Sequence, residues 1–210
     1  AVMRDNWAGH EELRLRMLRS KCKWGTNDPL ANAAAGRISK ALSRAVNGKP
    51  NSRDGRFFVS GHCARQFVLQ GERIGATPDG RKAGEEVSKN LSPTMGADTE
   101  GVTALVLSLG SLDSIDWPGD FPLDVMMLPY TVSGDKGLEA MAVIVHEFFN
   151  RGGAMIQFNI VDAEELLDAQ AHPEKYENLQ IRVCGWNVRW NDLSKSEQDA
   201  YILRARALAF

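Results

Sequence analysis

The hydrophobic and polar positions of this chain follow two periods. Apolar residues three or four positions apart indicate amphipathic helices, and short apolar runs bounded by Gly, Pro or Asp indicate strands. The clearest helical stripe consists of apolar residues at positions i, i+3, i+4, i+7 and i+11, namely Leu138, Met141, Ala142, Val145 and Phe149. Strand-like and helix-like segments alternate through the second half of the chain, which predicts an α/β fold.

These patterns assign an element to most of the chain. Helices are predicted over residues 10–22, 29–46, 102–112, 134–153, 162–176 and 195–208. Strands are predicted over residues 121–132, 154–161 and 179–183, and one or two short strands, interrupted at Ser60–Gly61, over residues 56–71. Asp162 with Glu165, and Ser194 with Glu197, have the spacing of capping pairs at helix N-termini. Residues 184–192 are predicted to form a loop.

A long segment without regular period, GERIGATPDGRKAGEEVSKNLSPTMGADTEG, separates the two halves. Irregular stretches of this length are uncommon inside compact domains and are usually functional or disordered. Pro78–Asp79–Gly80 has the chemistry of a turn. Arg81 and Lys82 are cations that could hold an anion, but no strand-to-helix phosphate-binding motif surrounds them. The pattern alone therefore leaves a functional loop and a surface linker both open.

Composition narrows the class of protein. The 210 residues allow one large domain or two small ones, and 43% apolar with 25% charged residues is ordinary for a globular protein. A net charge of −2 gives no reason to expect nucleic acid or an anionic membrane as partner. The first residues lack the apolar core of a signal peptide, which favours a cytoplasmic location. They also lack an initiator Met, which is typical of a fragment of a longer chain.

The cysteine spacing and the absent motifs argue against several common kinds of site. Cys22, Cys63 and Cys184 have neither CxxC nor Cys/His ligand spacing, so no disulfide framework and no metal site is expected. The motifs of P-loop and dinucleotide-binding proteins and of serine hydrolases are also absent from the sequence.

Gly185, in the stretch IRVCGWNVRW, has two interpretations. A glycine that follows a strand is most often a turn residue, because it lacks a Cβ. A glycine can also store a radical. Loss of one Cα hydrogen leaves a carbon radical between an amide nitrogen donor and a carbonyl acceptor, and both groups delocalise the unpaired electron. The local sequence leaves both interpretations open.

Several motifs resemble one known family. IRVCGW, preceded by VDAEELLDAQAHPEKYENL, resembles the C-terminal signature of the pyruvate formate-lyase-like glycyl radical enzymes. GATPDGRKAGEEVSKNLSPTMGADTEG resembles their long glycine-rich segment, and KWGTND resembles their late barrel region. The resemblance implies that Gly185 carries the radical and that Arg182, Val183, Cys184 and Trp186 are its loop neighbours.

The same resemblance implies a fold and a division into domains. The expected fold is α/β, namely the C-terminal part of the family's ten-stranded α/β barrel together with the glycyl radical domain. Residues 1–75 would belong to the barrel, and residues 76–210 would form the glycine radical domain.

The implied mechanism needs a cysteine from elsewhere. In this family the glycyl radical takes hydrogen from a cysteine thiol, and the thiyl radical then takes hydrogen from the substrate. That cysteine lies in a G-C-V/I-E-like context, which none of the three cysteines here has. Cys184 occupies a position where the family accepts Ser or Ala, so it is not expected to be the thiyl carrier. We therefore expect no turnover from this chain alone.

The subgroup is suggested by departures from the family pattern. Trp186 replaces the usual Tyr, and RVCGWNVRW resembles the fumarate-adding benzylsuccinate and alkylsuccinate synthases. This implies addition of a hydrocarbon, an alkane or a toluene-like compound, to fumarate in anaerobic hydrocarbon degradation. Gln66 is a candidate to bind a fumarate carboxylate, since an amide donates hydrogen bonds.

Other activities stay open at this point. The chain also fits another glycyl radical enzyme: a dehydratase, a decarboxylase, a C–N lyase or a formate acetyltransferase. It further fits a short, non-catalytic, radical-bearing spare-part protein, or a plain α/β domain in which Gly185 is only a turn residue.

The resemblance also implies partners rather than a bound cofactor. The radical would be installed by a separate activating enzyme that uses S-adenosylmethionine and an iron–sulfur cluster. The resemblance implies a homodimer of the full-length chain, or a complex with small accessory subunits. For the activating enzyme to reach Gly185, we expect the 153–210 segment to undock as a unit.

Overall fold

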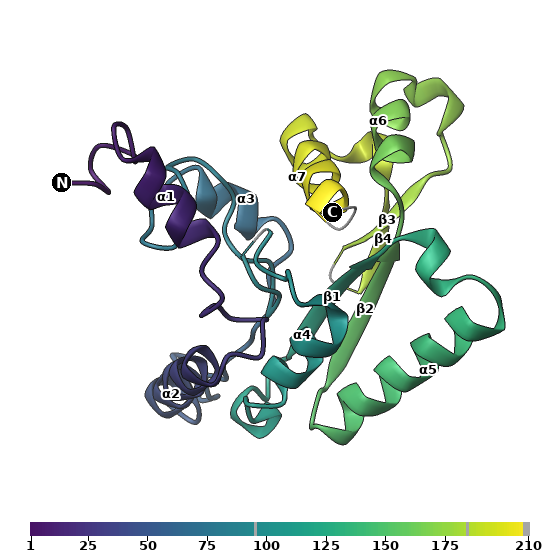
Figure 1. Ribbon diagram of the computed structural model, residues 1–210. Coiled ribbons are helices and arrows are strands. Elements are labelled where there is room, and N and C mark those ends of the chain that lie inside the picture. Colours follow the sequence, from purple (N-terminus) through teal and green to yellow (C-terminus); the bar gives the residue numbers. More distant parts are fainter. Residues whose placement is uncertain (95, 184, 208–210) are drawn as a thin grey trace.

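The computed structural model describes residues 1–94, 96–183 and 185–207 (Figure 1). The α-helices are α1 Glu11–Leu18, α2 Pro29–Val46, α3 Gln66–Gly71, α4 Gly101–Leu109, α5 Gly134–Asn150, α6 Ala163–Ala171 and α7 Lys195–Ala207. The strands are β1 Pro122–Met127, β2 Met155–Ile160, β3 Gln180–Val183 and β4 Trp186–Arg189. Short 3₁₀ turns lie at Ser114–Asp116, Pro129–Val132, Pro173–Lys175 and Trp190–Asp192. Within the described ranges, no helix combines the length and the apolar character needed to cross a membrane.

Two small sheets organise the second half of the chain. β1 and β2 pair in parallel, from Pro122 opposite Met155 to Met127 opposite Ile160, and α5 forms the crossover between them. β3 and β4 form an antiparallel hairpin in which Val183 lies opposite Trp186. The β3–β4 hairpin lies beside α6 and α7, and α5 lies away from both of these helices (Figure 1). The predicted α/β character is therefore confirmed for the described residues.

The β1–β2 sheet has one apolar face, because successive side chains of a strand point to opposite faces. Leu123 and Val125 of β1 are buried with α4 and with Phe148 of α5. The members of this core cluster are Leu105, Val106, Leu109, Leu112, Phe121, Leu123, Val125 and Phe148. The alternate residues of both strands point to the opposite face, where Asp124, Gln157 and Asn159 are buried polar residues.

A second core joins the hairpin to α6 and α7. Its buried members are Met126, Val161, Ala163, Leu166, Ala169, Ile181, Val183, Trp190, Tyr201, Ile202 and Ala205. The predicted caps are confirmed: Glu165 N donates to Asp162 Oδ1 at 2.7 Å, and Ser194 N donates to Glu197 Oε2 at 3.0 Å. These caps satisfy backbone donors at the start of α6 and α7, which fixes where both helices begin.

Two predictions of secondary structure were wrong. Residues 56–71, expected to be strands, contain α3 and take part only in isolated bridges among the described residues. Phe67, Val68 and Gly71 are buried at helical spacing, and Phe67 and Val68 cluster with Ala200 of α7, so tertiary packing overrides the β-like composition. Residues 184–192, expected to be a loop, contain β4. That strand is mostly exposed, so it carries little hydrophobic alternation.

Tertiary contacts order the long glycine-rich segment. The Arg81 side chain is 4% exposed, and its guanidinium donates to carbonyls of its own loop, including those of Ile74, Gly75 and Lys82. Trp7 Nε1 donates in turn to the Arg81 carbonyl at 3.2 Å. Since its Nη1 and Nη2 atoms bind backbone oxygens, the Arg81 side chain holds its own loop together.

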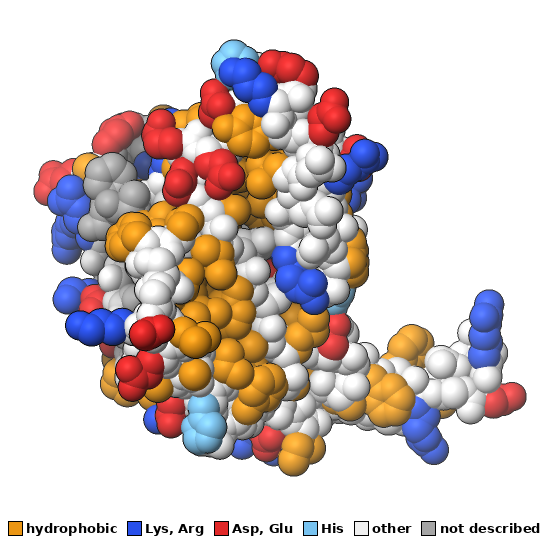
Figure 2. Space-filling view, turned by 90° about the vertical axis from the view of Figure 1, so that its right-hand side faces the viewer, with side chains coloured by type: hydrophobic (Ala, Val, Ile, Leu, Met, Phe, Trp, Pro, Cys, Tyr) orange, Lys and Arg blue, Asp and Glu red, His pale blue; other side chains and the backbone are white. Residues whose placement is uncertain are grey.

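The apolar stripe of α5 lies on the surface. Such a stripe ordinarily faces the core, yet Leu138 is 70% and Phe149 is 50% exposed. Figure 2 looks at this side of the molecule and shows hydrophobic side chains gathered into a broad patch. α5 packs on the rest of the chain through Gly137 and Phe148 instead. A Cβ on Gly137 would overlap the Val132 backbone, so this glycine allows the helix to approach closely.

The contrast between two leucines is testable. Leu123→Ala should lower the free energy of unfolding of this chain by about 2–5 kcal/mol, because it empties a fully buried position. Leu138→Ala should change it by less than about 0.5 kcal/mol, because the side chain is exposed. Urea unfolding measures both values, and a comparable loss from both substitutions would contradict the surface position of the α5 stripe.

Candidate functional site

Gly185 lies in the turn of the β3–β4 hairpin. Val183 and Trp186 are the last paired residues, so the chain reverses between them. The φ angle of Gly185 is +92°, in the region that favours glycine. A Cβ built on this residue would lie 3.1 Å from Met155 Cε of β2. The positive φ therefore favours a glycine here, and a side chain would also require the Met155 methyl group to shift by a few tenths of an ångström. Cys184, predicted as a loop neighbour, lies outside the described residues.

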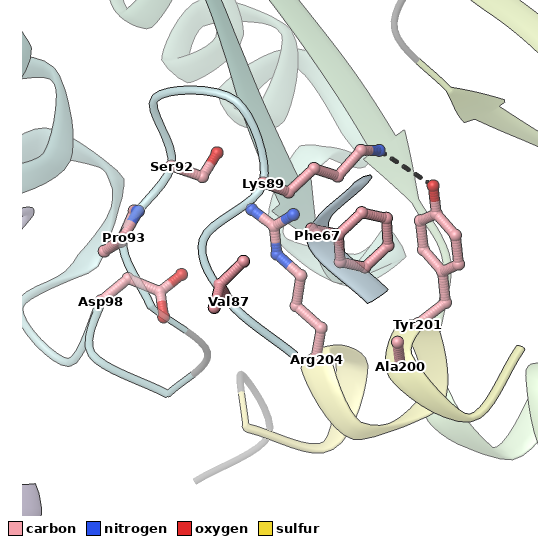
Figure 3. Close-up of a pocket in the computed structure, with 9 residues that line it drawn as sticks. All are labelled: Phe67, Val87, Lys89, Ser92, Pro93, Asp98, Ala200, Tyr201 and Arg204. Atoms are coloured by element: carbon pink, nitrogen blue, oxygen red, sulfur yellow. Dashed lines mark hydrogen bonds between the residues drawn. The ribbon is translucent and has the colours of Figure 1, made fainter. Parts of the chain in front are cut away.

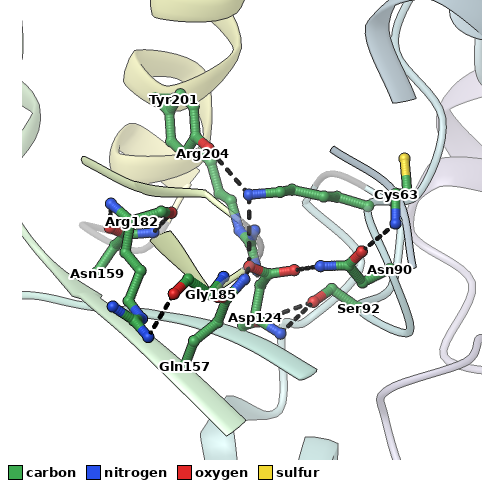
Figure 4. Close-up of polar contacts among 11 residues, drawn as sticks. Cys63, Asn90, Ser92, Asp124, Gln157, Asn159, Arg182, Gly185, Tyr201 and Arg204 are labelled. Carbon is green, nitrogen blue, oxygen red and sulfur yellow. Dashed lines mark hydrogen bonds and ion pairs between the residues drawn. The ribbon is translucent and has the colours of Figure 1, made fainter. Parts of the chain in front are cut away.

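Two side chains bind the backbone groups on either side of the Gly185 Cα (Figure 4). Gly185 N donates to Gln157 Oε1 at 2.7 Å. Arg182 Nη2 donates to the Gly185 carbonyl oxygen at 3.0 Å, and Arg182 Nη1 donates to Asn187 Oδ1 at 3.3 Å. The amide nitrogen and the carbonyl of this one residue are thus both held by side chains from fixed strands.

Strand β2 places Gln157 and its neighbours against the hairpin. Residues two positions apart lie on the same face of a strand, and Met155, Gln157 and Asn159 all face β3 and its turn. Asn159 Oδ1 accepts from Arg182 N at 2.9 Å, and Asn159 Nδ2 donates to the Arg182 carbonyl at 3.0 Å. This amide holds the backbone of the residue whose guanidinium reaches Gly185.

Asp124 supports the Gln157 side chain from β1. The two residues are direct partners in the parallel register, and Gln157 Nε2 donates to Asp124 Oδ1. Asn90 Nδ2 donates to Asp124 Oδ2, and Lys89 Nζ lies 3.4 Å from Asp124 Oδ1. The carboxylate is 1% exposed and Lys89 is 5% exposed, so this ion pair is buried. A buried charge of this kind is tolerated only when it is paired and hydrogen-bonded.

Lys89 connects this network to the last helix. Its Nζ donates to the Tyr201 hydroxyl at 2.9 Å and lies 5.1 Å from the Tyr201 ring centroid and 5.8 Å from that of Phe67 (Figure 3). Burial raises the pKa of the Tyr201 phenol above its ordinary value, and the Lys89 cation opposes that shift. Arg204 Nη2, also from α7, donates to the Asp124 carbonyl at 2.8 Å.

Trp186, the residue after Gly185, contacts the segment before α3. Its ring stacks on His62 with centroids 6.0 Å apart, and His62 Nδ1 lies 2.8 Å from Asp120 Oδ2. Trp186 is 49% exposed, so one side of the indole remains on the surface. The β3–β4 hairpin is therefore in contact with a residue from the first third of the chain.

The predicted site residues divide into two groups. Gly185, Arg182, Val183 and Trp186 lie together at the hairpin, and Val183 is buried in the core beneath it. Gln66 is exposed at the start of α3, where its Oε1 accepts from Gln70 Nε2 at 3.2 Å. No hydrogen bond joins it to the Gly185 network in the described part of the chain, and its substrate role stays a prediction.

Sequence reasoning missed the polar residues beneath the loop. Asp124 in PLDVMM, and Gln157 and Asn159 in MIQFNI, stand at alternate positions of otherwise apolar strands. That period-2 placement of polar residues was the available signal, because it gives one strand face a different character from the other. No group of three His, Cys, Asp or Glu side chains suited to a metal ion occurs among the residues that the structure describes.

Gly185 can be compared with a second left-handed glycine. Gly185→Ala should cost about 1–2 kcal/mol of stability from the positive φ, plus the cost of moving Met155 Cε. Gly84→Ala is the matched control, because Gly84 has a φ of +86° and no atom lies within 4 Å of a Cβ built on it. This variant should lose only the stability that the positive φ costs. Chemical unfolding of both variants checks this. A neutral Gly185→Ala would contradict the described geometry.

The pKa of Tyr201 predicts a dependence on alkaline pH. Because its pKa is raised in the folded chain, the phenol keeps its proton at a pH where the unfolded chain loses it. The protonated phenol therefore contributes its full stabilisation to the free energy of unfolding below about pH 10. This stabilisation falls as the pH rises further, by no more than roughly 1.4 kcal/mol per pH unit. Tyr201→Phe should be less stable at pH 8, because the hydrogen bond with Lys89 is lost. The gap to the wild type should narrow above pH 10 in urea titrations. Tyr130→Phe, at a 73% exposed position, is the control, and a constant Tyr201→Phe gap would refute the assignment.

The comparisons with known proteins agree on one family. The sequence model of the family described as "Glycine radical" matches residues 87–191, half of this chain. The trans-4-hydroxy-L-proline dehydratase of Clostridioides difficile is 35% identical over 95% of this chain and 25% of its own length. The indoleacetate decarboxylase of Tractidigestivibacter scatoligenes is 31% identical over 87% of this chain and 21% of its own length. The glycerol-bound B12-independent glycerol dehydratase from Clostridium butyricum matches with a TM-score of 0.91 at 30% identity, over 97% of this chain and 26% of that chain.

These matches bear differently on the predictions. The chain spans about a quarter of the length of these relatives. They are dehydratases and a decarboxylase, so they do not support the specific resemblance to benzylsuccinate and alkylsuccinate synthases. The ten-stranded barrel and the domain boundary between residues 75 and 76 stay predictions. The wider resemblance is confirmed: this chain belongs to the glycine radical family.

Proposed function

We propose that this chain is the radical-bearing part of a glycyl radical enzyme and that Gly185 holds the unpaired electron. The observation that carries the proposal is the environment of Gly185, whose N–H and C=O are each held by a side chain. A glycyl radical is delocalised through both groups only while the adjoining peptides stay planar with the radical carbon. Fixing both groups favours that geometry.

The reaction would begin with a hydrogen atom leaving the Gly185 Cα. We propose that a separate activating enzyme, with S-adenosylmethionine and an iron–sulfur cluster, removes it. The glycyl radical then takes a hydrogen atom from a cysteine thiol, which restores the glycine and leaves a thiyl radical. The thiyl radical takes a hydrogen atom from the substrate and later returns one to the product radical. Each transfer moves one proton and one electron together, so no external oxidant or reductant is consumed during turnover.

The thiyl cysteine is proposed to lie outside this sequence. Cys22 is exposed, and Cys63 is half-buried with its backbone N donating to Asn90 Oδ1 at 2.6 Å. Neither has the sequence context of the family's catalytic cysteine. The homodimer, the accessory subunits and the undocking of the 153–210 segment are likewise proposals about the longer enzyme.

Dehydration or decarboxylation is the reaction class that the relatives favour. In a dehydration, the thiyl radical takes a hydrogen atom from one carbon of the substrate. The hydroxyl on the neighbouring carbon departs as water with a proton given up by an O–H or N–H group on the radical carbon, and the product radical recovers a hydrogen atom from the thiol. Fumarate addition is the second candidate. It rests on Trp186, which stands where the family usually has Tyr and presents a half-exposed indole beside Gly185.

Electron paramagnetic resonance tests the radical assignment. The full-length enzyme that contains these residues, activated without oxygen, should give a glycyl doublet. Gly185→Ala should abolish the doublet, and Gly84→Ala, at a distant glycine of similar φ, should retain it.

Product analysis of the activated wild type then separates the reaction classes. Hydroxyproline, glycerol and indoleacetate probe dehydration and decarboxylation, and fumarate with toluene or an alkane probes addition. A doublet that survives Gly185→Ala would refute the proposed site, whatever the substrate.

A further inference from the structure

We propose that Gln157 and Arg182 polarise the two sides of the Gly185 radical in opposite senses, and that Asp124 sets the orientation of Gln157. Gln157 and Asp124 are positioning residues in this proposal, since neither exchanges hydrogen with Gly185. The inference rests on the proposed function, because it describes how the same site stabilises its radical.

The nitrogen side of the radical needs an electron donor. Gln157 Oε1 accepts the Gly185 N–H at 2.7 Å, which is a short bond for an amide donor and a carbonyl acceptor. Acceptance of this hydrogen shifts electron density from the N–H bond onto nitrogen. The nitrogen then donates more strongly to the electron-deficient Cα, so this contact stabilises the radical more than the closed-shell glycine.

The carbonyl side needs an electron acceptor. Arg182 Nη2 donates to the Gly185 oxygen at 3.0 Å, and a guanidinium is always charged. A charge-assisted hydrogen bond draws density toward the oxygen, so the carbonyl withdraws spin from the Cα more effectively. Both contacts therefore stabilise a radical on the same carbon, one by strengthening the nitrogen as an electron donor and the other by strengthening the carbonyl as an electron acceptor.

The donor contact depends on the rotation of one amide group. If Gln157 were flipped, its NH₂ would face the Gly185 N–H, and two donors would meet. The Asp124 carboxylate prevents this, because an ionised carboxylate only accepts hydrogen bonds and so selects Nε2. Gln157 is 2% exposed, so water cannot readily replace either partner.

Asp124 is fixed in turn by the glycine-rich segment. Lys89 and Asn90 bind its two carboxylate oxygens, and the Ser92 hydroxyl donates to its carbonyl at 2.8 Å. In Figure 4 the Asn90 and Ser92 side chains reach Asp124 from the side opposite Gln157. The glycine-rich segment therefore has a specific role. It holds the Asp124 carboxylate, which orients the Gln157 amide, and that amide binds Gly185.

The experiment compares radical lifetimes in the activated full-length enzyme without substrate. Gln157→Met keeps the volume of the side chain and removes the acceptor, so the lifetime of the doublet should fall about 2- to 10-fold, the factor expected for one hydrogen bond. Asp124→Asn as a single substitution should also shorten the lifetime of the doublet. Combined with Gln157→Met it should shorten the lifetime little further, because Asp124 acts through Gln157. Gln198→Met is the matched control, since Gln198 is half-buried on α7 and donates to the Trp190 carbonyl, away from Gly185.

A second measurement needs no variant and so does not depend on their folding. After exchange in D₂O, electron–nuclear double resonance on the wild-type radical should detect a deuteron on the Gly185 nitrogen and another within hydrogen-bond distance of its carbonyl oxygen. Absence of a doublet in the wild type would refute the proposed function. A normal doublet with no carbonyl-bound deuteron, or with an unchanged lifetime in a folded Gln157→Met variant, would overturn only the present inference.

Discussion

The buried carboxylate of Asp124 is the constraint on which the site depends. A carboxylate that is 1% exposed is unfavourable unless other groups supply charge and hydrogen bonds. Lys89 supplies the charge, and Asn90 and Gln157 supply N–H donors. These partners come from the irregular segment and from β2, so distant parts of the chain must assemble before Asp124 can be buried. The same assembly brings Gln157 to the hairpin turn.

Much of the fold could be predicted because its signals are local. Asp162 and Ser194 cap α6 and α7 as their spacing predicts, and Gly185 is the turn residue that a glycine after a strand indicates. A cap or a turn depends on residues a few positions apart, which one sequence displays. Gly185 shows that two interpretations of such a signal need not compete, since it is a turn glycine and also lies within the residues that the family model matches.

The remaining features depend on contacts between distant residues. α3 is a helix because Phe67 and Val68 meet α7, well over a hundred positions along the chain. Gln157 could not be assigned to the site from the sequence, because its contacts depend on the sheet register, which places it beside Asp124, and on the hairpin, which brings Gly185 to it. The α5 stripe has the period of a core-facing helix, but period alone does not say which surface will cover it. In each case the sequence does not show which distant residues the element contacts.

Met155 gives the hairpin turn one more property. The two hydrogens on the Cα of a free glycine are related by mirror symmetry and have equal surroundings. In this turn, one of them occupies the side where a side chain would meet the Met155 methyl group, and the other points away from it. The fold thus makes a prochiral carbon sterically asymmetric. A group that approached this carbon from the Met155 side would therefore meet a methyl group.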